Sequence, residues 1–211
     1  MALKQRLSGI RRICKKNDYF ESDYMIFDLL DYIFGELKMI VYKLLFFGKL
    51  KYHIYGKYSR QLQIRIFNKG RLYIGKNTVF RAGTKIRIQK TGKVTIGSGT
   101  GFNYYCIINS HNSISIGENT IIGQNVKFYD HDHNYKTHGN RRSTGFTTEP
   151  IVVGDNVWIG SDCLILKGAK IGSNSVIAAG TVVKGEIPES SLVYNKKEIV
   201  IKEIAYKELR F

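Results

Sequence analysis

The sequence predicts an all-β fold, a three-sided solenoid built from short parallel strands. Apolar residues recur every six positions, and the 211-residue chain holds 21 glycines but only 2 prolines. The spacing is strict at Val153, Ile159, Ile165, Ile171, Ile177 and Val183. Residues of modest size follow the first five of these by four positions, at Val157, Cys163, Ala169, Ser175 and Thr181.

A period of six fits neither an α-helix nor a simple amphipathic strand. It is typical of a short strand followed by a turn, with one large apolar residue pointing inward in each repeat. Small residues beside it, as in the Ile-Gly pairs that begin at Ile74-Gly75, let the backbone turn a corner. Three such sides give a coil of about 18 residues, and stacked coils align their Ile and Val side chains along one axis.

Two stretches carry a resemblance to a known family. Residues 149–161 read EPIVVGDNVWIGS and residues 177–183 read IAAGTVV. With the repeat from Ile64 to Ile187, they resemble the hexapeptide-repeat acyltransferases, closest to sugar and capsular polysaccharide O-acetyltransferases. The resemblance implies a left-handed parallel β-helix, an exception to right-handed crossovers. It also implies acetyl-CoA as co-substrate, a saccharide acceptor, and a homotrimer with active sites between neighbouring chains.

The repeat is broken once, between Asn134 and Val153, which predicts an extruded loop over residues 134–149. Just before it stands the run YDHDHN, residues 129–134. Histidine is the usual base for removing a hydroxyl proton near neutral pH. Aligned with the family, His133 matches its base, and His131 is a weaker candidate that we assign to the acceptor site with Arg141. In an extended strand His131 and His133 share one face, with Asp130 and Asp132 opposite.

Two other readings of the Asp-His run are open: a solvated turn, or a zinc-chelating pair. The γ-class carbonic anhydrases, which are β-helix enzymes, hold zinc with three histidines taken from separate coils and chains. His53 and His111 are isolated here, with no second histidine group in phase. The base is therefore favoured, and no metal is expected.

The resemblance assigns further site residues. Trp158 lies at the corner before Ile159, where its indole could face outward, line the donor channel and donate to the oxyanion; core packing is the alternative. Asn103 matches a residue that binds the acceptor and steadies the intermediate, although asparagine is also common in turns. The proposed coenzyme A contacts are Trp158, Ser161, Ala179 and Lys184. Lys196 or Lys197 could supply the charge for a coenzyme A phosphate in place of Lys184. Ser161 and Ala179 are expected to stack in adjacent coils.

The chain divides into three parts: a helical capping segment (1–60), the β-helix acyltransferase domain (61–188) and a tail (189–211). Leu3, Leu7, Ile10 and Cys14 are spaced for one face of a basic amphipathic helix. A second helical stripe runs from Phe27 to Leu45. We interpret these helices as a lid on the solenoid; peripheral membrane contact through the basic N-terminus is the alternative.

Charge and cysteine content limit the setting. The formal net charge is +16, which indicates an anionic partner: nucleic acid, a membrane surface, or a phosphorylated cofactor or substrate. Three scattered cysteines without a CxxC pair argue against a disulfide framework, and Cys106 and Cys163 fall at core positions. No secretory signal is evident at the start of the chain. We expect a cytoplasmic protein, with a position at the inner face of the membrane as the alternative.

Together these features predict an O-acetyltransferase that moves an acetyl group from acetyl-CoA directly to a saccharide hydroxyl, as in capsular or surface polysaccharide modification. One alternative enzyme is a xenobiotic acetyltransferase of the streptogramin or chloramphenicol type. An alternative from another class is a non-catalytic basic solenoid that binds nucleic acid, for which exposed aromatic–Arg clusters would be expected but are not established.

Overall fold

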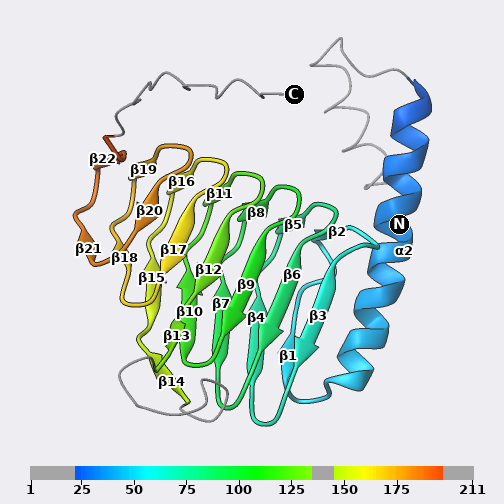
Figure 1. Ribbon diagram of the computed structural model, residues 1–211. Helices are drawn as coiled ribbons and strands as arrows, with labels where there is room; N and C mark the ends of the chain where they lie inside the picture. Colours follow the sequence, from blue (N-terminus) through cyan, green and yellow to red (C-terminus); the bar gives the residue numbers. More distant parts are fainter. Residues whose placement is uncertain (1–21, 135–144, 197–211) are drawn as a thin grey trace, which may run out of the picture.

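The computed structural model describes residues 22–134 and 145–196, which form a triangular prism with one helix at its N-terminal end (Figure 1). Each side of the prism is a parallel sheet, and the chain visits the three sheets in turn. Sheet 1 contains β1 (Leu50–Lys51), β4 (Arg71–Ile74), β7 (Lys93–Ile96), β10 (Ser113–Ile116), β15 (Ile151–Val153), β18 (Lys170–Ile171) and β21 (Glu186–Ile187).

Sheet 2 contains β2 (Lys57–Tyr58), β5 (Val79–Phe80), β8 (Gly101–Phe102), β11 (Ile121–Ile122), β16 (Trp158–Ile159), β19 (Val176–Ile177) and β22 (Leu192–Val193). Sheet 3 contains β3 (Gln63–Ile66), β6 (Lys85–Ile88), β9 (Ile107–Ser110), β12 (Lys127–Tyr129), β17 (Leu164–Leu166) and β20 (Val182–Val183). The predicted fold class, a left-handed parallel β-helix with a helical cap and one extruded loop, is confirmed.

The core is a ladder of identical or similar side chains from successive coils. Ile96, Ile116 and Val153 pair in register along sheet 1 and are all buried. Along sheet 2, Phe80 stacks on Phe102 with ring centroids 4.7 Å apart. The six residues of the strict repeat are buried, as are the five smaller residues that follow them, so the predicted inward pattern is confirmed.

The coils shorten along the prism, which the expected 18-residue coil did not anticipate. Leu72 pairs with Val94, and Val94 with Ile114, so the early coils are 22 and 20 residues long. Val153 pairs with Ile171, so the coil that follows the arm has 18 residues, and the last coil, from Ile171 to Ile187, has 16. The early strands of sheets 1 and 3 have four residues, which adds length to each side and hides the six-residue period.

The solenoid begins before residue 61. β1 and β2 already pair in parallel with β4 and β5, and the inward positions of this first coil are taken by Leu50, Tyr58 and Leu62. These residues replace the Ile-Gly pairs of later coils, so the six-residue search did not find them. At the other end, β22 carries the solenoid to Val193.

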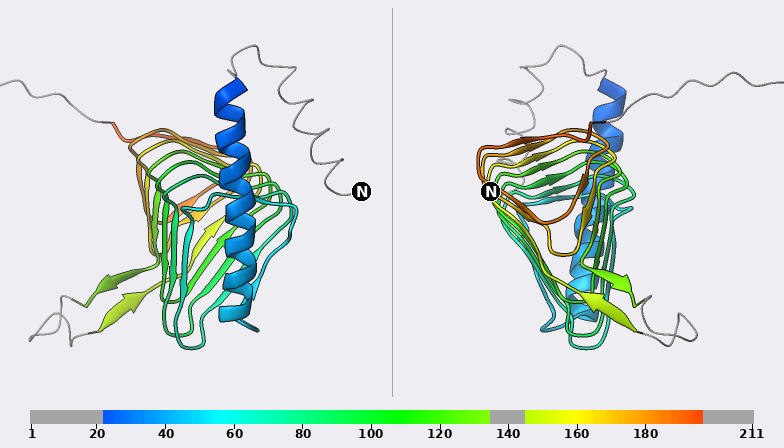
Figure 2. Two further views of the ribbon diagram at one scale, coloured as in Figure 1. Left: turned by 90° about the vertical axis from the view of Figure 1, so that its right-hand side faces the viewer. Right: turned by 60° about the vertical axis from the view of Figure 1, so that its left-hand side comes forward.

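The lid is α2 (Ser22–Leu45), which lies across the open end of the prism (Figure 2). It packs closely at Gly35, where an added Cβ would lie 1.6 Å from the carbonyl oxygen of Tyr58. Lys38 Nζ also donates to the carbonyl of Arg60 at 2.9 Å. The helix therefore caps the prism, as predicted, but the apolar side chains of the stripe from Phe27 to Leu45 are exposed.

The other predicted helix, over Leu3 to Cys14, lies outside the described residues. The part of the predicted tail that follows Lys196 also lies outside them. Within the described part of the chain, no helix combines the length and apolar character needed to cross a membrane.

Close stacking of turns makes some glycines indispensable. A Cβ on Gly117 would lie 2.4 Å from the carbonyl oxygen of Gly154 in the next coil, whereas one on Gly101 meets nothing within 4 Å. We therefore expect Gly117→Ala to cost about 1–3 kcal/mol of unfolding free energy, because the backbone must shift. Gly101→Ala is the matched control and should leave urea unfolding nearly unchanged; equal losses in both would contradict this account.

Candidate active site

The chain leaves the prism at a two-stranded arm. β13 (His131–His133) pairs antiparallel with β14 (Phe146–Thr148), His131 opposite Thr148 and His133 opposite Phe146. The arm projects from the edge where sheet 3 turns into sheet 1 (Figure 2). The extrusion therefore starts at residue 131, three residues before the predicted loop, because the Asp-His run is itself an arm strand rather than part of a coil.

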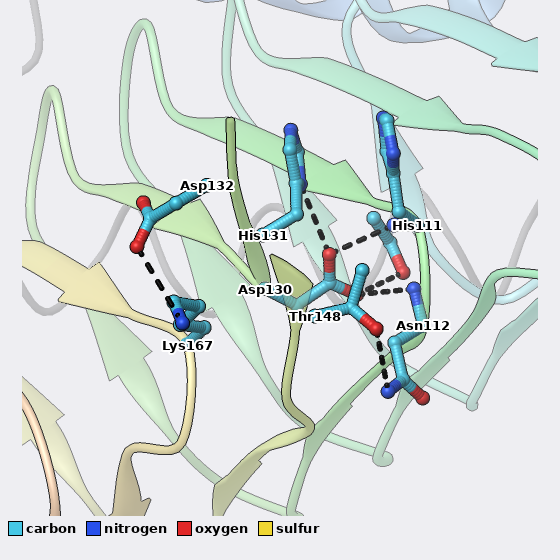
Figure 3. Close-up of polar contacts among 8 residues, drawn as sticks. His111, Asn112, Asp130, His131, Asp132, Thr148 and Lys167 are labelled. Carbon is cyan, nitrogen blue, oxygen red and sulfur yellow. Dashed lines mark hydrogen bonds and ion pairs between the residues drawn. The ribbon is translucent and has the colours of Figure 1, made fainter. Parts of the chain in front are cut away.

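Asp130 anchors the base of the arm (Figure 3). Its carboxylate is fully buried and accepts hydrogen bonds from Ser110 Oγ (2.7 Å) and from the backbone N–H groups of His111 and Asn112 (both 2.8 Å). His131 Nδ1 lies 3.1 Å from the same carboxylate. These contacts join the arm to the loop after β9 in the preceding coil.

The network keeps Asp130 ionised. Burial opposes the charge, but the hydrogen bonds from His131, His111, Ser110 and Asn112 outweigh it and hold the pKa of Asp130 below its usual value. A buried carboxylate with this many donors is a rigid point from which the arm can extend.

His111 is not isolated, contrary to the sequence analysis. Its ring stacks on that of His131 at 3.8 Å between centroids, and Phe146 packs edge-on against it at 4.4 Å. The pairing of Asn109 with Tyr129 puts the two histidines in adjacent coils. Their spacing of twenty residues was out of phase with the expected 18, so the sequence did not bring them together.

His133 lies farther along the arm and is exposed. The strand is extended, as predicted, and the His131 and His133 rings both contact Phe146, at 5.3 and 4.6 Å between centroids. Asp132 turns the other way and lies 3.7 Å from Lys167 Nζ. Sequence reasoning missed Phe146 and Lys167, because neither belongs to a motif.

The other candidate residues lie along sheet 2. Trp158 in β16 points outward and is 55% exposed, so it is not a core residue. Asn103, Ser161 and Ala179 occupy the turns that follow β8, β16 and β19. Gly180 N–H donates to the carbonyl of Ser161 at 2.8 Å, which confirms that Ser161 and Ala179 lie in adjacent coils.

Lys184 follows β20 at the end of sheet 3 and is exposed, on the same edge of the prism as the arm. Arg141 and Lys197 lie outside the described residues, and Lys196 is exposed near their end. The predicted site residues thus fall into two groups. His131, His133 and Lys184 lie where sheet 3 meets sheet 1, whereas Asn103, Ser161 and Ala179 lie where sheet 2 meets sheet 3, beside Trp158.

Neither group offers a metal centre in the described residues, where no cluster of three or more His, Cys, Asp or Glu side chains is arranged to hold an ion. The two buried thiols behave as core residues: Cys106 and Cys163 are both buried. Burial raises the pKa of the Cys106 thiol to about 11.

Comparison with known proteins places the chain in a family. The family model described as bacterial transferase hexapeptide (six repeats) matches residues 150–185. The putative lipopolysaccharide biosynthesis O-acetyl transferase WbbJ of Escherichia coli is 30% identical over 148 residues, which cover 65% of this chain and 74% of WbbJ. The chain is a member of the hexapeptide-repeat acetyltransferases.

One further relative and one solved structure of the same fold set the limits of the comparison. The galactoside O-acetyltransferase of E. coli is 35% identical over 111 residues, and the chain spans 54% of its length. The crystal structure of AntD, an N-acyltransferase from Bacillus cereus in complex with dTDP and 3-hydroxybutyryl-CoA, matches with a TM-score of 0.59 and 19% identity. That match covers 74% of this chain and 81% of AntD, and it shows the shared fold.

The histidine stack makes stability depend on pH. Burial, and then the charge of neighbouring His131, lower the pKa of His111 to about 4 from an ordinary value of 6.5. The unfolded chain therefore binds a proton that the folded chain does not between these two values. This contribution is complete above pH 6.5 and is lost as the pH falls towards 4.

We expect the melting temperature of wild type to decline as the pH falls from 6.5 to 4. The variant His111→Phe keeps a stacked ring but has no group that titrates, so its decline should be smaller. The Asp130 carboxylate should add its own loss only at lower pH, because its pKa is already depressed. His53→Phe is the control for removing a histidine elsewhere, and an identical pH profile for all three proteins would contradict the role of His111.

Proposed function

We propose that this acetyltransferase moves an acetyl group from acetyl-CoA to a hydroxyl of a saccharide, with His133 as the general base. The observation that carries the proposal is the position of His133: an exposed imidazole on a projecting arm, held against Phe146 and clear of the core. A core histidine could not reach a substrate, whereas this one can. The names of WbbJ and of WcaF, a putative colanic acid biosynthesis acetyltransferase, support a surface polysaccharide as acceptor.

In this mechanism His133 takes the proton from the acceptor hydroxyl as its oxygen attacks the thioester carbonyl carbon. The tetrahedral intermediate carries a negative oxygen, to which the indole N–H of Trp158 can donate. Collapse breaks the carbon–sulfur bond, and the leaving thiolate takes up the proton that His133 removed from the hydroxyl, which returns the imidazole to its neutral form. We propose direct transfer, and the burial of Cys106 and Cys163, the two thiols in the described residues, supports it, because a buried thiol is not available as an acyl carrier.

The donor would lie along the turns of sheet 2. Ser161 and Ala179 are stacked one coil apart and offer backbone groups to an extended pantetheine arm. Exposed Trp158 lies three residues before Ser161 in the same coil. Lys184 is the candidate partner of a coenzyme A phosphate. His131, Asn103 and Arg141 are the proposed acceptor contacts.

The two edges of the prism support a homotrimer with sites between subunits. Within one chain, His133 lies on the edge between sheets 3 and 1. Trp158 lies on sheet 2, and Asn103 lies in the turn that follows β8 of that sheet. An arm that reaches the sheet 2 face of a neighbour would bring both groups together. The buried free thiols suit a reducing compartment, and we propose the cytoplasm.

Replacing the base tests the mechanism. We expect His133→Ala to reduce acetyl transfer from acetyl-CoA to its best saccharide acceptor by roughly 10²–10⁴-fold, because the variant lacks the imidazole that takes the hydroxyl proton. His53→Ala should retain the wild-type rate, since His53 lies in the first coil far along the chain from the arm. An unchanged rate in His133→Ala removes this residue from the mechanism.

Subunit mixing tests the shared site. We expect His133→Ala and Trp158→Ala each to be impaired, and a mixed oligomer of the two to regain part of the wild-type rate. In such a mixture one interface joins an intact histidine from one chain to an intact tryptophan from another. If both residues of each site come from the same chain, mixing will restore nothing.

The alternatives predict other substrates. A xenobiotic acetyltransferase would acetylate streptogramin or chloramphenicol in preference to saccharides, which parallel assays on both classes distinguish. A nucleic-acid-binding solenoid would bind DNA with a steep salt dependence and fail to bind coenzyme A resin. The relatives that match this chain favour the enzyme.

A further inference from the structure

The outer face of α2 is a large apolar surface without a partner in the described residues. α2 packs on the prism through Gly35, Met39, Tyr42 and Phe46. The opposite side, with the residue just beyond it, exposes ten large apolar side chains, which we call the outer face: Phe27, Leu30, Ile33, Phe34, Leu37, Ile40, Val41, Leu44, Leu45 and Phe47. Contiguous exposed apolar surface of this kind marks an interaction site.

The face spans the whole end of the molecule. α2 has 24 residues and is therefore about 36 Å long. Figure 2, in its left view, shows it lying across the open end of the prism, with its outer side turned away from every sheet.

The charge of the protein is concentrated at the same end. From Lys38 to Gly117 the sequence contains fifteen lysines and arginines and no aspartate or glutamate. Because the coils follow one another along the axis, these cations extend from the last turns of α2 over the first coils, and the acidic residues of the prism begin with Glu118. The earlier turns of α2 carry Asp28, Asp31 and Glu36, so the positive charge lies on the coils rather than on the helix. Basic side chains nearest the helix, such as Lys51, Lys57 and Arg65, are exposed.

We propose that the outer face of α2 docks on an anionic phospholipid bilayer. The helix would lie in the plane of the interface with its apolar side chains among the acyl chains, while the lysines and arginines of the first coils meet the headgroups. The prism would then stand on the membrane with its C-terminal coils farthest from the lipid (Figure 1). This inference concerns a different surface from the catalytic arm and does not depend on the proposed function.

Two other occupants fit less well. A second copy of the chain would bring two equally basic ends together, and like charges across an interface oppose association. Nucleic acid would satisfy the cations but would leave ten apolar side chains in water. Only a partner that is both apolar and anionic matches both features, and a bilayer with acidic lipids is such a partner.

Vesicle flotation with the full chain tests the proposal. The vesicles are phosphatidylcholine alone, or phosphatidylcholine with phosphatidylglycerol as one lipid in three. We expect wild type to float with the acidic vesicles, and the triple variant Phe34→Ser, Leu37→Ser, Val41→Ser to bind them more than tenfold more weakly, because three buried apolar contacts are lost. The matched control, Val182→Ser with Leu192→Ser, removes exposed apolar residues at the far end and should bind like wild type.

A second variant tests the charge. Replacing Lys51, Lys57 and Arg65 by glutamine should weaken binding to the acidic vesicles and reduce its salt dependence, with little effect on neutral vesicles. The melting temperature of each variant shows whether it folds; Leu44→Ser with Leu45→Ser replaces the triple variant if that one does not.

Several results would overturn the proposal. Wild type could fail to float with either vesicle, or the triple variant could float as well as wild type. Light scattering could show that the triple variant forms a smaller oligomer than wild type, while wild type does not bind vesicles. The outer face would then be an interface between copies of the chain. Binding to DNA but not to lipid would assign the cations to nucleic acid.

Discussion

The structure depends on stacking each coil on the one before it with inward side chains in register. Backbone hydrogen bonds run from every coil to the next, and Ile, Val and Phe side chains of successive coils fill the axis. Even the buried polar residues obey this order: Thr100 donates to the carbonyl of Gly117 one coil away, at 2.7 Å. Because each coil buries its apolar side chains only against its neighbours, the ends need a cover, and α2 supplies it at the first coil.

A prism with a filled axis has no room for chemistry inside, so function must lie on its edges and faces. The arm is the largest departure from the stack, and its attachment is correspondingly specific. At Asp130 the coil has four hydrogen bonds where other inward positions have apolar packing. From there the stacked rings of His111 and His131, and then Phe146, form a row of ring contacts that ends at His133. The exposed imidazole of His133 is thus connected through packed rings to a fixed buried charge.

The same linear construction separates these features along the axis. The N-terminal coils and α2 combine cations with an apolar face, the middle coil carries the arm, and the C-terminal coils carry the turns of Ser161 and Ala179. Each region can therefore be altered by substitution without disturbing the others, since contacts between distant coils are absent from this kind of fold.

The sequence by itself determined the solenoid, its inward residues from Val153 to Val183 and the position of the break, because a repeat of local geometry is written directly in residue spacing. It also pointed to the Asp-His run, a polar cluster that a packed core would not contain. Only the tertiary structure decided which residues meet across coils. Coil lengths of 22, 20 and 18 residues set which side chains become neighbours, and this brought His111 to His131 and Phe146 to His133. It likewise decided that α2 turns its richest apolar stripe away from the prism, because the side that fits the first coil is the one with Gly35, where the backbones approach most closely.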